Sequence, residues 1–174
     1  MKALLILLAL TTVANAETEP ERMVSVTFSP VHLVLPMAEV EIEGRVAPHL
    51  GAAVIGGLGR VSSTSGTTTA TATAYEAGLQ GNYYFMRDFA GLHAGVEVMY
   101  LSLGDVDIDN SVTADGVSAG PYVGYKGVFS FGLTLTAQLG VDFVVAHARS
   151  SSTQQMASEK TVLPLLNLNA GWSF

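Results

Sequence analysis

The chain has 174 residues, a formal net charge of −7 and no cysteine. The acidic balance argues against a nucleic-acid-binding protein, which needs a basic surface, and without cysteine there is neither a disulfide framework nor a thiolate metal site. Hydrophobic residues make up 49% of the chain and charged residues 13%, whereas a soluble domain is usually about a quarter charged. Residues 17–174 nevertheless contain no apolar run long enough for a transmembrane helix. A β-barrel, in which one face of each strand is apolar, accounts for both observations.

The N-terminus predicts a secretory signal peptide over residues 1–16. Lys2 provides a basic start, residues 3–10 are apolar, and Ala14-Asn15-Ala16 has the small-x-small pattern of a cleavage site. Residues 17–174 are then expected to form one domain.

From Met23 onward the apolar residues recur with period two rather than 3.6, which predicts strands and no helices. Eight strands are expected, and they cover approximately residues 23–33, 38–46, 50–61, 71–85, 92–103, 117–126, 129–146 and 162–174. The predicted fold class is all-β: an eight-stranded antiparallel up-and-down transmembrane β-barrel.

The connections between these strands alternate in length. Short turns are expected near residues 47–49, 86–90 and 127–128, and longer polar loops over residues 62–70, 104–116 and 149–160. Short turns on one rim and long loops on the other are typical of bacterial outer-membrane barrels. The pattern therefore predicts the outer membrane of a Gram-negative bacterium, with both termini periplasmic.

The apolar faces are expected to contact lipid and the polar faces to line the interior. The predicted interior polar cluster consists of Glu39, Glu41, Glu43, Arg45, Glu76, His93, Glu97, Lys126 and Asp142. An eight-stranded interior is just wide enough for side chains to fill, so Arg45, His93 and Lys126 are expected to pair with carboxylates in a plugged barrel. Because acids outnumber bases, a narrow cation-preferring channel is the alternative.

Two motifs resemble functional sites without matching them. Residues 116–120 read G-x-S-x-G, and Asp142 and His147 follow in the order of an α/β-hydrolase; the next residues continue a strand, so no nucleophile elbow is predicted. Residues 105–110 resemble the start of a Ca²⁺ loop, but Asn110 replaces the glycine and position twelve is Gly116. We expect a solvated loop there, with a weak divalent site that bridges lipid headgroups as the alternative.

The four histidines, His32, His49, His93 and His147, lie on different segments with no i, i+4 pair. No zinc motif, other metal site or cofactor is therefore predicted.

The C-terminal segment carries a family resemblance. Its alternate residues are apolar, and they are Leu166, Leu168, Ala170, Trp172 and Phe174. With the signal peptide and the eight strands, this tail resembles that of the small outer-membrane β-barrels of the OmpX and OmpA-transmembrane type. The resemblance implies that the barrel-assembly machinery recognises the tail, and that the protein is a monomer in contact with outer-membrane lipids and lipopolysaccharide. It also implies a non-enzymatic structural or surface-interaction role.

Lipid A deacylases are an enzymatic branch of these small barrels, and they use His, Ser and Glu near the outer leaflet. Here His147 and Ser150 lie three residues apart and no partner Glu is evident. The resemblance therefore predicts no catalytic residue, and an outer-leaflet lipid hydrolase remains an alternative function.

Overall fold

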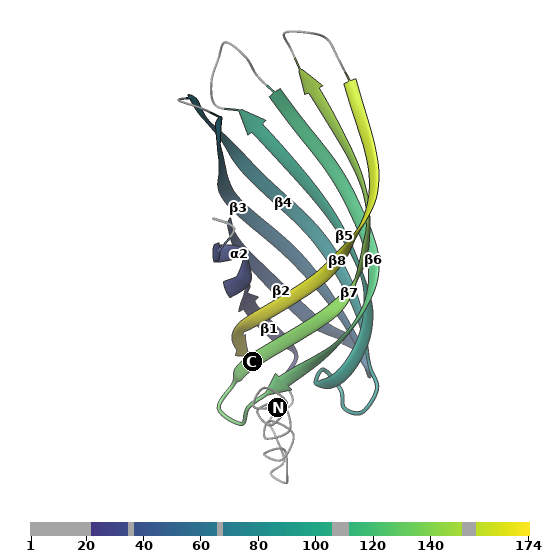
Figure 1. Cartoon of the computed structure of the whole chain (residues 1–174). Coiled ribbons are helices and arrows are strands. Elements are labelled where there is room, and N and C mark those ends of the chain that lie inside the picture. Colours follow the sequence, from purple (N-terminus) through teal and green to yellow (C-terminus); the bar gives the residue numbers. More distant parts are fainter. Residues whose placement is uncertain (1–21, 35–36, 66–67, 106–111, 151–155) are drawn as a thin grey trace, which may run out of the picture.

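Eight antiparallel strands form a closed barrel in which each strand pairs with the next and β8 pairs with β1 (Figure 1). The computed structural model describes residues 22–34, 37–65, 68–105, 112–150 and 156–174. The elements are β1 (Val24–Phe28), α2 (Pro30–Val34), β2 (Met37–Ala47), β3 (Leu50–Ser65), β4 (Thr68–Tyr84), β5 (Gly91–Asp105), β6 (Val112–Val128), β7 (Leu133–Ser150) and β8 (Met156–Ser173). The predicted eight-stranded antiparallel β-barrel is confirmed.

Among the described residues, no helix combines the length and the apolar character that a membrane crossing requires.

The period-two pattern separates an apolar outer surface from a polar interior. In β7, Leu135 and Leu139 are exposed on the outside, whereas Thr136 and Gln138 between them are buried, because successive side chains of a strand point to opposite faces. Among the described residues that are buried, polar or charged ones outnumber apolar ones by 16 to 8. Soluble proteins show the opposite preference.

At one rim the strands are longer than expected. The predicted loop over residues 62–70 is wrong for most of its length, because β3 runs to Ser65, β4 begins at Thr68, and the two strands pair residue by residue up to that point. Threonine is well suited to a pleated strand, so this Ser/Thr-rich segment extends the sheet. The connections that remain there, residues 66–67, 106–111 and 151–155, lie outside the described residues, as does most of the Ca²⁺-like segment.

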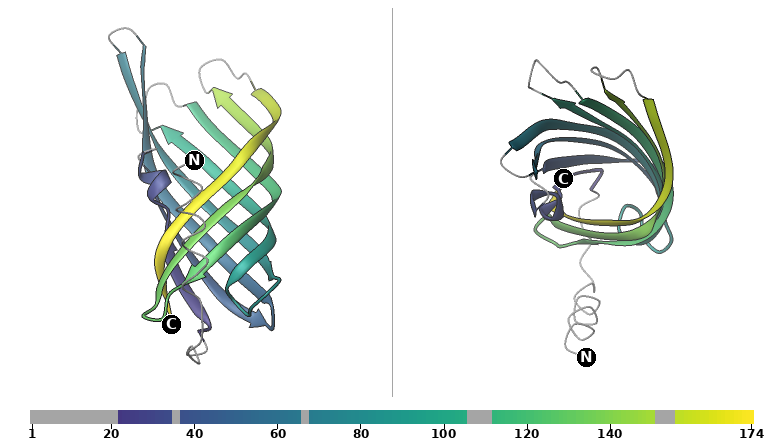
Figure 2. Two further views of the ribbon diagram at one scale, coloured as in Figure 1. Left: turned by 60° about the horizontal axis from the view of Figure 1, so that its bottom comes forward. Right: turned by 45° about the horizontal axis from the view of Figure 1, so that its top comes forward.

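Tight turns close the opposite rim, where the C-terminus also lies (Figure 2, left). The seventh strand was expected to begin at Phe129, but Phe129 N donates to Leu133 O at 2.9 Å and residues 129–132 form a turn. Gly132 has φ +109, a conformation that L-residues rarely adopt. A Cβ atom at this position would also overlap the Trp172 indole. Gly132 therefore allows residues 129–132 to form a turn, although Phe129 and Phe131 follow the alternation of a strand.

The barrel closes through a short seam. Only residues 25–28 of β1 pair with β8, opposite residues 170–173, although β8 itself has 18 residues. The predicted first strand, residues 23–33, is wrong beyond Phe28, because the chain enters α2 at Pro30, whose fixed φ favours the first position of a helix. Helix α2 contacts β2 and β8, and Ser29 Oγ donates to Leu168 O at 3.4 Å.

Candidate functional site in the barrel interior

A buried ion pair lies in the interior near the tight-turn rim. Lys126 Nζ donates to Glu43 Oε2 at 2.6 Å and to Ser25 Oγ at 2.9 Å, and it lies 3.4 Å from the centroid of the Phe89 ring. The ammonium group thus has a counter-ion, a hydroxyl and an aromatic face, which together offset its removal from water. The expectation that Lys126 pairs with a carboxylate is confirmed.

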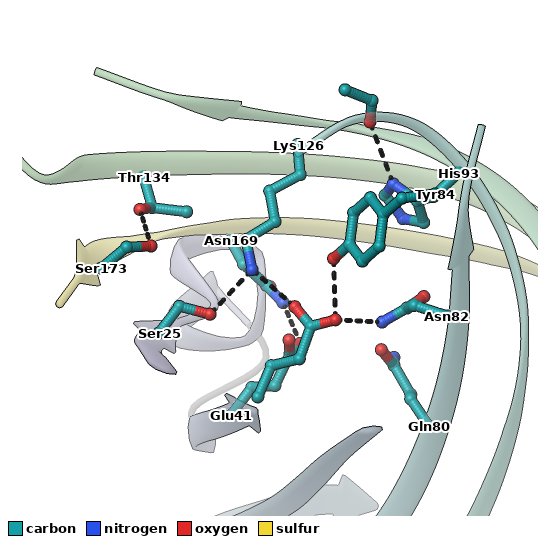
Figure 3. A network of polar contacts seen from close by, with 12 residues as sticks. Ser25, Glu41, Gln80, Asn82, Tyr84, His93, Lys126, Thr134, Asn169 and Ser173 are labelled. Carbon is teal, nitrogen blue, oxygen red and sulfur yellow. Dashed lines mark hydrogen bonds and ion pairs between the residues drawn. The ribbon is translucent and has the colours of Figure 1, made fainter. Parts of the chain in front are cut away.

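The second carboxylate oxygen of Glu43 connects this pair to β4, through Tyr84 and Asn82, both labelled in Figure 3. Tyr84 OH donates to Glu43 Oε1 at 2.7 Å, and Asn82 Nδ2 donates to the same atom at 2.8 Å. Tyr122 OH in turn donates to Asn82 Oδ1 at 2.7 Å. Since these residues belong to β2, β4 and β6, the network spans the interior and fixes the strands relative to one another.

Amide side chains fill the next layer. Glu97 accepts hydrogen bonds from Gln80 and, at 3.1 Å, from Asn167, and Glu41 accepts one from Asn169 at 2.7 Å. Asp142 on β7 is half-buried, and its Oδ1 has no hydrogen-bond partner among the described residues. Three of the acids expected inside, Glu41, Glu43 and Glu97, thus have amide or hydroxyl donors.

Of the other two expected cation–carboxylate pairs, that of Arg45 is present and that of His93 is not. Arg45 Nη1 lies 3.7 Å from Asp88 Oδ2, which belongs to the β4–β5 turn at the rim. His93 is fully buried, and its ring nitrogens face Gly91 O and Gln138 Nε2, each at 3.3 Å, rather than a carboxylate. The register of the strands determines which side chains reach one another, and it leaves His93 without a carboxylate partner among the described residues.

A second cluster of charged groups lies beside the seam. His32 Nδ1 on α2 is 3.3 Å from Glu39 Oε2 on β2 and 2.9 Å from Ser29 Oγ. Glu76 on β4 completes the cluster: one potential ligand atom from each of His32, Glu39 and Glu76 lies within 4.8 Å of the other two. The sequence predicts Glu39 and Glu76 in the interior but gives no signal for His32, because the three donors lie on separate segments and no spacing motif links them.

The outer surface carries an aromatic belt at the tight-turn rim. Ring centroids of Tyr83 and Phe85 lie 5.4 Å apart, and those of Phe131 and Trp172 lie 5.7 Å apart. All four side chains are exposed. Of the tail residues expected to face outward, Leu166, Leu168, Trp172 and Phe174 are exposed and Ala170 is half-exposed.

A row of polar residues crosses the outer surface near the other rim. Asp115 on β6 pairs with His147 on β7, and His147 pairs with Ser158 on β8. Directly opposed residues of antiparallel strands have Cβ atoms about 4.5–5.5 Å apart on the same face, although no hydrogen bond joins these three described side chains. From the sequence, only Ser150, three residues from His147, suggests a partner for it at the outer rim. The G-x-S-x-G segment lies within β6, so the strand–turn–helix that this motif needs is absent from the described residues.

The chain matches no protein-family model, no curated protein and no solved structure.

Proposed function

We propose that this chain is an integral outer-membrane β-barrel protein with a side-chain-filled interior and a non-enzymatic structural or surface-interaction role. One observation carries the proposal: large apolar side chains cover the outside, while polar and charged side chains are buried inside. Exposed apolar area is unfavourable in water by roughly 25 cal/mol per Å². In a bilayer the same surface is matched to its surroundings, so this arrangement suits a protein that has lipid as its solvent.

Two further features support a membrane setting. Each strand of the closed barrel pairs its backbone groups with both neighbours over the paired residues, as a hydrocarbon environment requires, and the seam between β1 and β8 is the shortest of these pairings. The aromatic belt of Tyr83, Phe85, Phe131 and Trp172 lies at one rim, at the level where aromatic side chains gather in membrane barrels. With that rim in the periplasm, the opposite rim would face lipopolysaccharide and external partners, as in the OmpX-type barrels that the chain resembles.

The packing of the interior favours a plugged barrel over a channel. Glu43, Lys126, Tyr84 and Asn82 form one hydrogen-bonded group, and the amide layer of Gln80, Gln138 and Asn167 lies beside it. An ion would have to break these contacts to pass. The acidic side chains therefore stabilise the interior in this proposal instead of conducting cations.

Conductance in a planar bilayer tests the proposal. Protein refolded into detergent is first checked for folding by heat-modifiable gel mobility, and it is then added to the bilayer. We expect a folded protein that inserts and remains electrically silent. Steady cation-selective steps that diminish in Glu41→Gln or Glu97→Gln would make the protein a channel, and failure of the folded protein to associate with lipid would overturn the membrane assignment.

An outer-leaflet lipid hydrolase is the second candidate, because Asp115, His147 and Ser158 lie side by side in one row. In such a role Ser158 Oγ would attack a lipid ester carbonyl while His147 takes its proton and passes it to the leaving alcohol, with Asp115 orienting the imidazole. Water would then cleave the Ser158 ester and release the acyl chain as a fatty acid. Mass spectrometry of lipopolysaccharide and phospholipid incubated with the folded protein separates the two functions. Acyl-chain release that is lost in Ser158→Ala and His147→Ala, but retained in Ser102→Ala, would establish the hydrolase; intact lipids support the non-enzymatic role.

A further inference from the structure

We propose that His32, Glu39 and Glu76 form a binding site for a divalent transition-metal cation such as Zn²⁺. The three side chains come from α2, β2 and β4, and one potential ligand atom of each lies within 4.8 Å of the other two. An imidazole with two carboxylates is a common zinc ligand set, in which three protein groups leave one position open. The nitrogen ligand disfavours Mg²⁺ and Ca²⁺, which prefer oxygen.

The strand register explains how the two carboxylates meet. Glu39 on β2 pairs with Gly57 on β3, and Gly57 pairs with Glu76 on β4. All three positions lie in one row across the sheet, so any side chain at residue 57 would stand between the two glutamates. A Cβ atom there would overlap the Glu76 carboxylate. Glycine at this position therefore leaves the space in which the glutamates approach each other.

The seam supplies the third ligand. Because β1 ends at Phe28 and the chain turns into α2, His32 is carried to the inner face of β2 instead of continuing along a strand. Its Nδ1 atom is already 3.3 Å from Glu39 Oε2. Ligand atoms about 2.1 Å from a tetrahedral ion lie roughly 3.4 Å apart, so this pair has the required separation, and the ligand atom of Glu76 lies within 4.8 Å of both.

The charge balance of the cluster also favours a cation. Glu39 is buried, and Glu76 Oε1 is buried with no hydrogen-bond partner among the described residues. A buried carboxylate oxygen without a partner is unfavourable. A divalent ion would neutralise both glutamates, and it would tie α2 to β2 and β4 beside the seam. The site is independent of the membrane assignment, since it needs only the folded barrel.

Isothermal titration of the folded, tag-free protein with Zn²⁺ tests the site. We expect one equivalent to bind, and we expect His32→Asn and Glu76→Gln each to weaken binding at least about 10-fold, since loss of even an outer-shell partner costs 10–100-fold. Matched controls are His49→Asn and Glu159→Gln, which change the same residue types outside the cluster, Glu159 being exposed on β8. His49 has φ 61, which asparagine tolerates, so this control should fold. Gel mobility and circular dichroism check the folding of each variant.

Two further measurements test whether the bound ion contacts these three side chains. Gly57→Ala retains all three ligands but moves Glu76, so we expect weaker Zn²⁺ binding in a folded barrel. Co²⁺ in place of Zn²⁺ should give the visible absorption of a four-coordinate ion, and this absorption should be lost in Glu76→Gln. If folded wild-type protein binds no Zn²⁺, or if the control variants weaken binding as much as the ligand variants, the proposal is wrong and His32 and Glu39 form an ion pair only.

Discussion

Lys126 Nζ and Glu43 Oε2 lie 2.6 Å apart, and both side chains are buried in the barrel interior. They belong to β6 and β2, so the ion pair reaches across the barrel and not between paired strands. Neither charge has bulk water as an alternative partner. Their interaction therefore holds opposite walls of the interior in a defined relation, and it gives the first prediction.

Lys126→Met should destabilise the barrel by about 3–5 kcal/mol, because Glu43 would remain as a buried charge without its counter-ion. The free energy of unfolding, measured by urea titration of the protein folded in lipid vesicles, reports the loss. The double variant Lys126→Met/Glu43→Gln should recover part of the stability, since no buried charge is then left over. Lys160→Met, at an exposed position, should change the free energy by less than about 0.5 kcal/mol. Equal effects at Lys126 and Lys160 would contradict the buried pair.

Tyr122→Ala should make the interior leaky. Tyr122 on β6 is buried and donates to Asn82 on β4, across the intervening strand β5, so its removal leaves a polar gap beside Gln80 that water can enter. Planar-bilayer recordings should change from silent to small, steady currents. Tyr125→Ala removes an exposed tyrosine from the outside of the same strand and should stay silent. Currents of the same size in both variants would show that the amide layer does not seal the barrel.

Leu139→Arg should destabilise the barrel in a bilayer by about 2–4 kcal/mol, which is the range for arginine at the midplane. Leu139 lies on the outer surface near the middle of β7. Met86→Arg, at a position 74% exposed in the β4–β5 turn, should have almost no effect because the guanidinium reaches water. The comparison of unfolding free energies in lipid vesicles is decisive: a tolerated Leu139→Arg would mean that the outer surface does not contact lipid.

Where the alternation is long, the sequence predicts both that a segment is a strand and which of its side chains share a face. The predicted seventh strand set Leu135 and Leu139 on one face and Thr136 and Gln138 on the other, and burial follows that division. Period two needs only local sequence, since the pleat alone decides which side chains share a face.

The ends of the strands and the short helix were not predictable in the same way. Five residues of α2 are too few to show a helical period, so residues 30–33 were read as strand. The Ser/Thr-rich residues 62–70 were read as a loop because their polarity resembles one, although pairing between β3 and β4 extends through most of them. Whether such a segment forms a strand depends on its pairing with another strand, which local composition does not reveal.

Interior contacts depended on register, which the sequence leaves open. Arg45, near the end of β2, reaches the carboxylate of Asp88 in the β4–β5 turn, a partner that the sequence does not identify. The approach of Glu39 to Glu76 likewise requires that Gly57 fall between them, and a shift of one residue would remove it. The sequence therefore predicts which side chains share a face of one strand, but not which side chains of different strands contact one another.

The most direct test of the central claim is a cysteine scan of residues 134–139, which the cysteine-free chain permits. Each single-cysteine variant is labelled with a fluorophore, reconstituted in vesicles, and exposed to a quencher attached to the lipid acyl chains. We predict strong quenching at residues 135, 137 and 139 and weak quenching at residues 134, 136 and 138. Uniformly weak quenching, or strong quenching at the even-numbered residues, would contradict a membrane barrel with a filled polar interior.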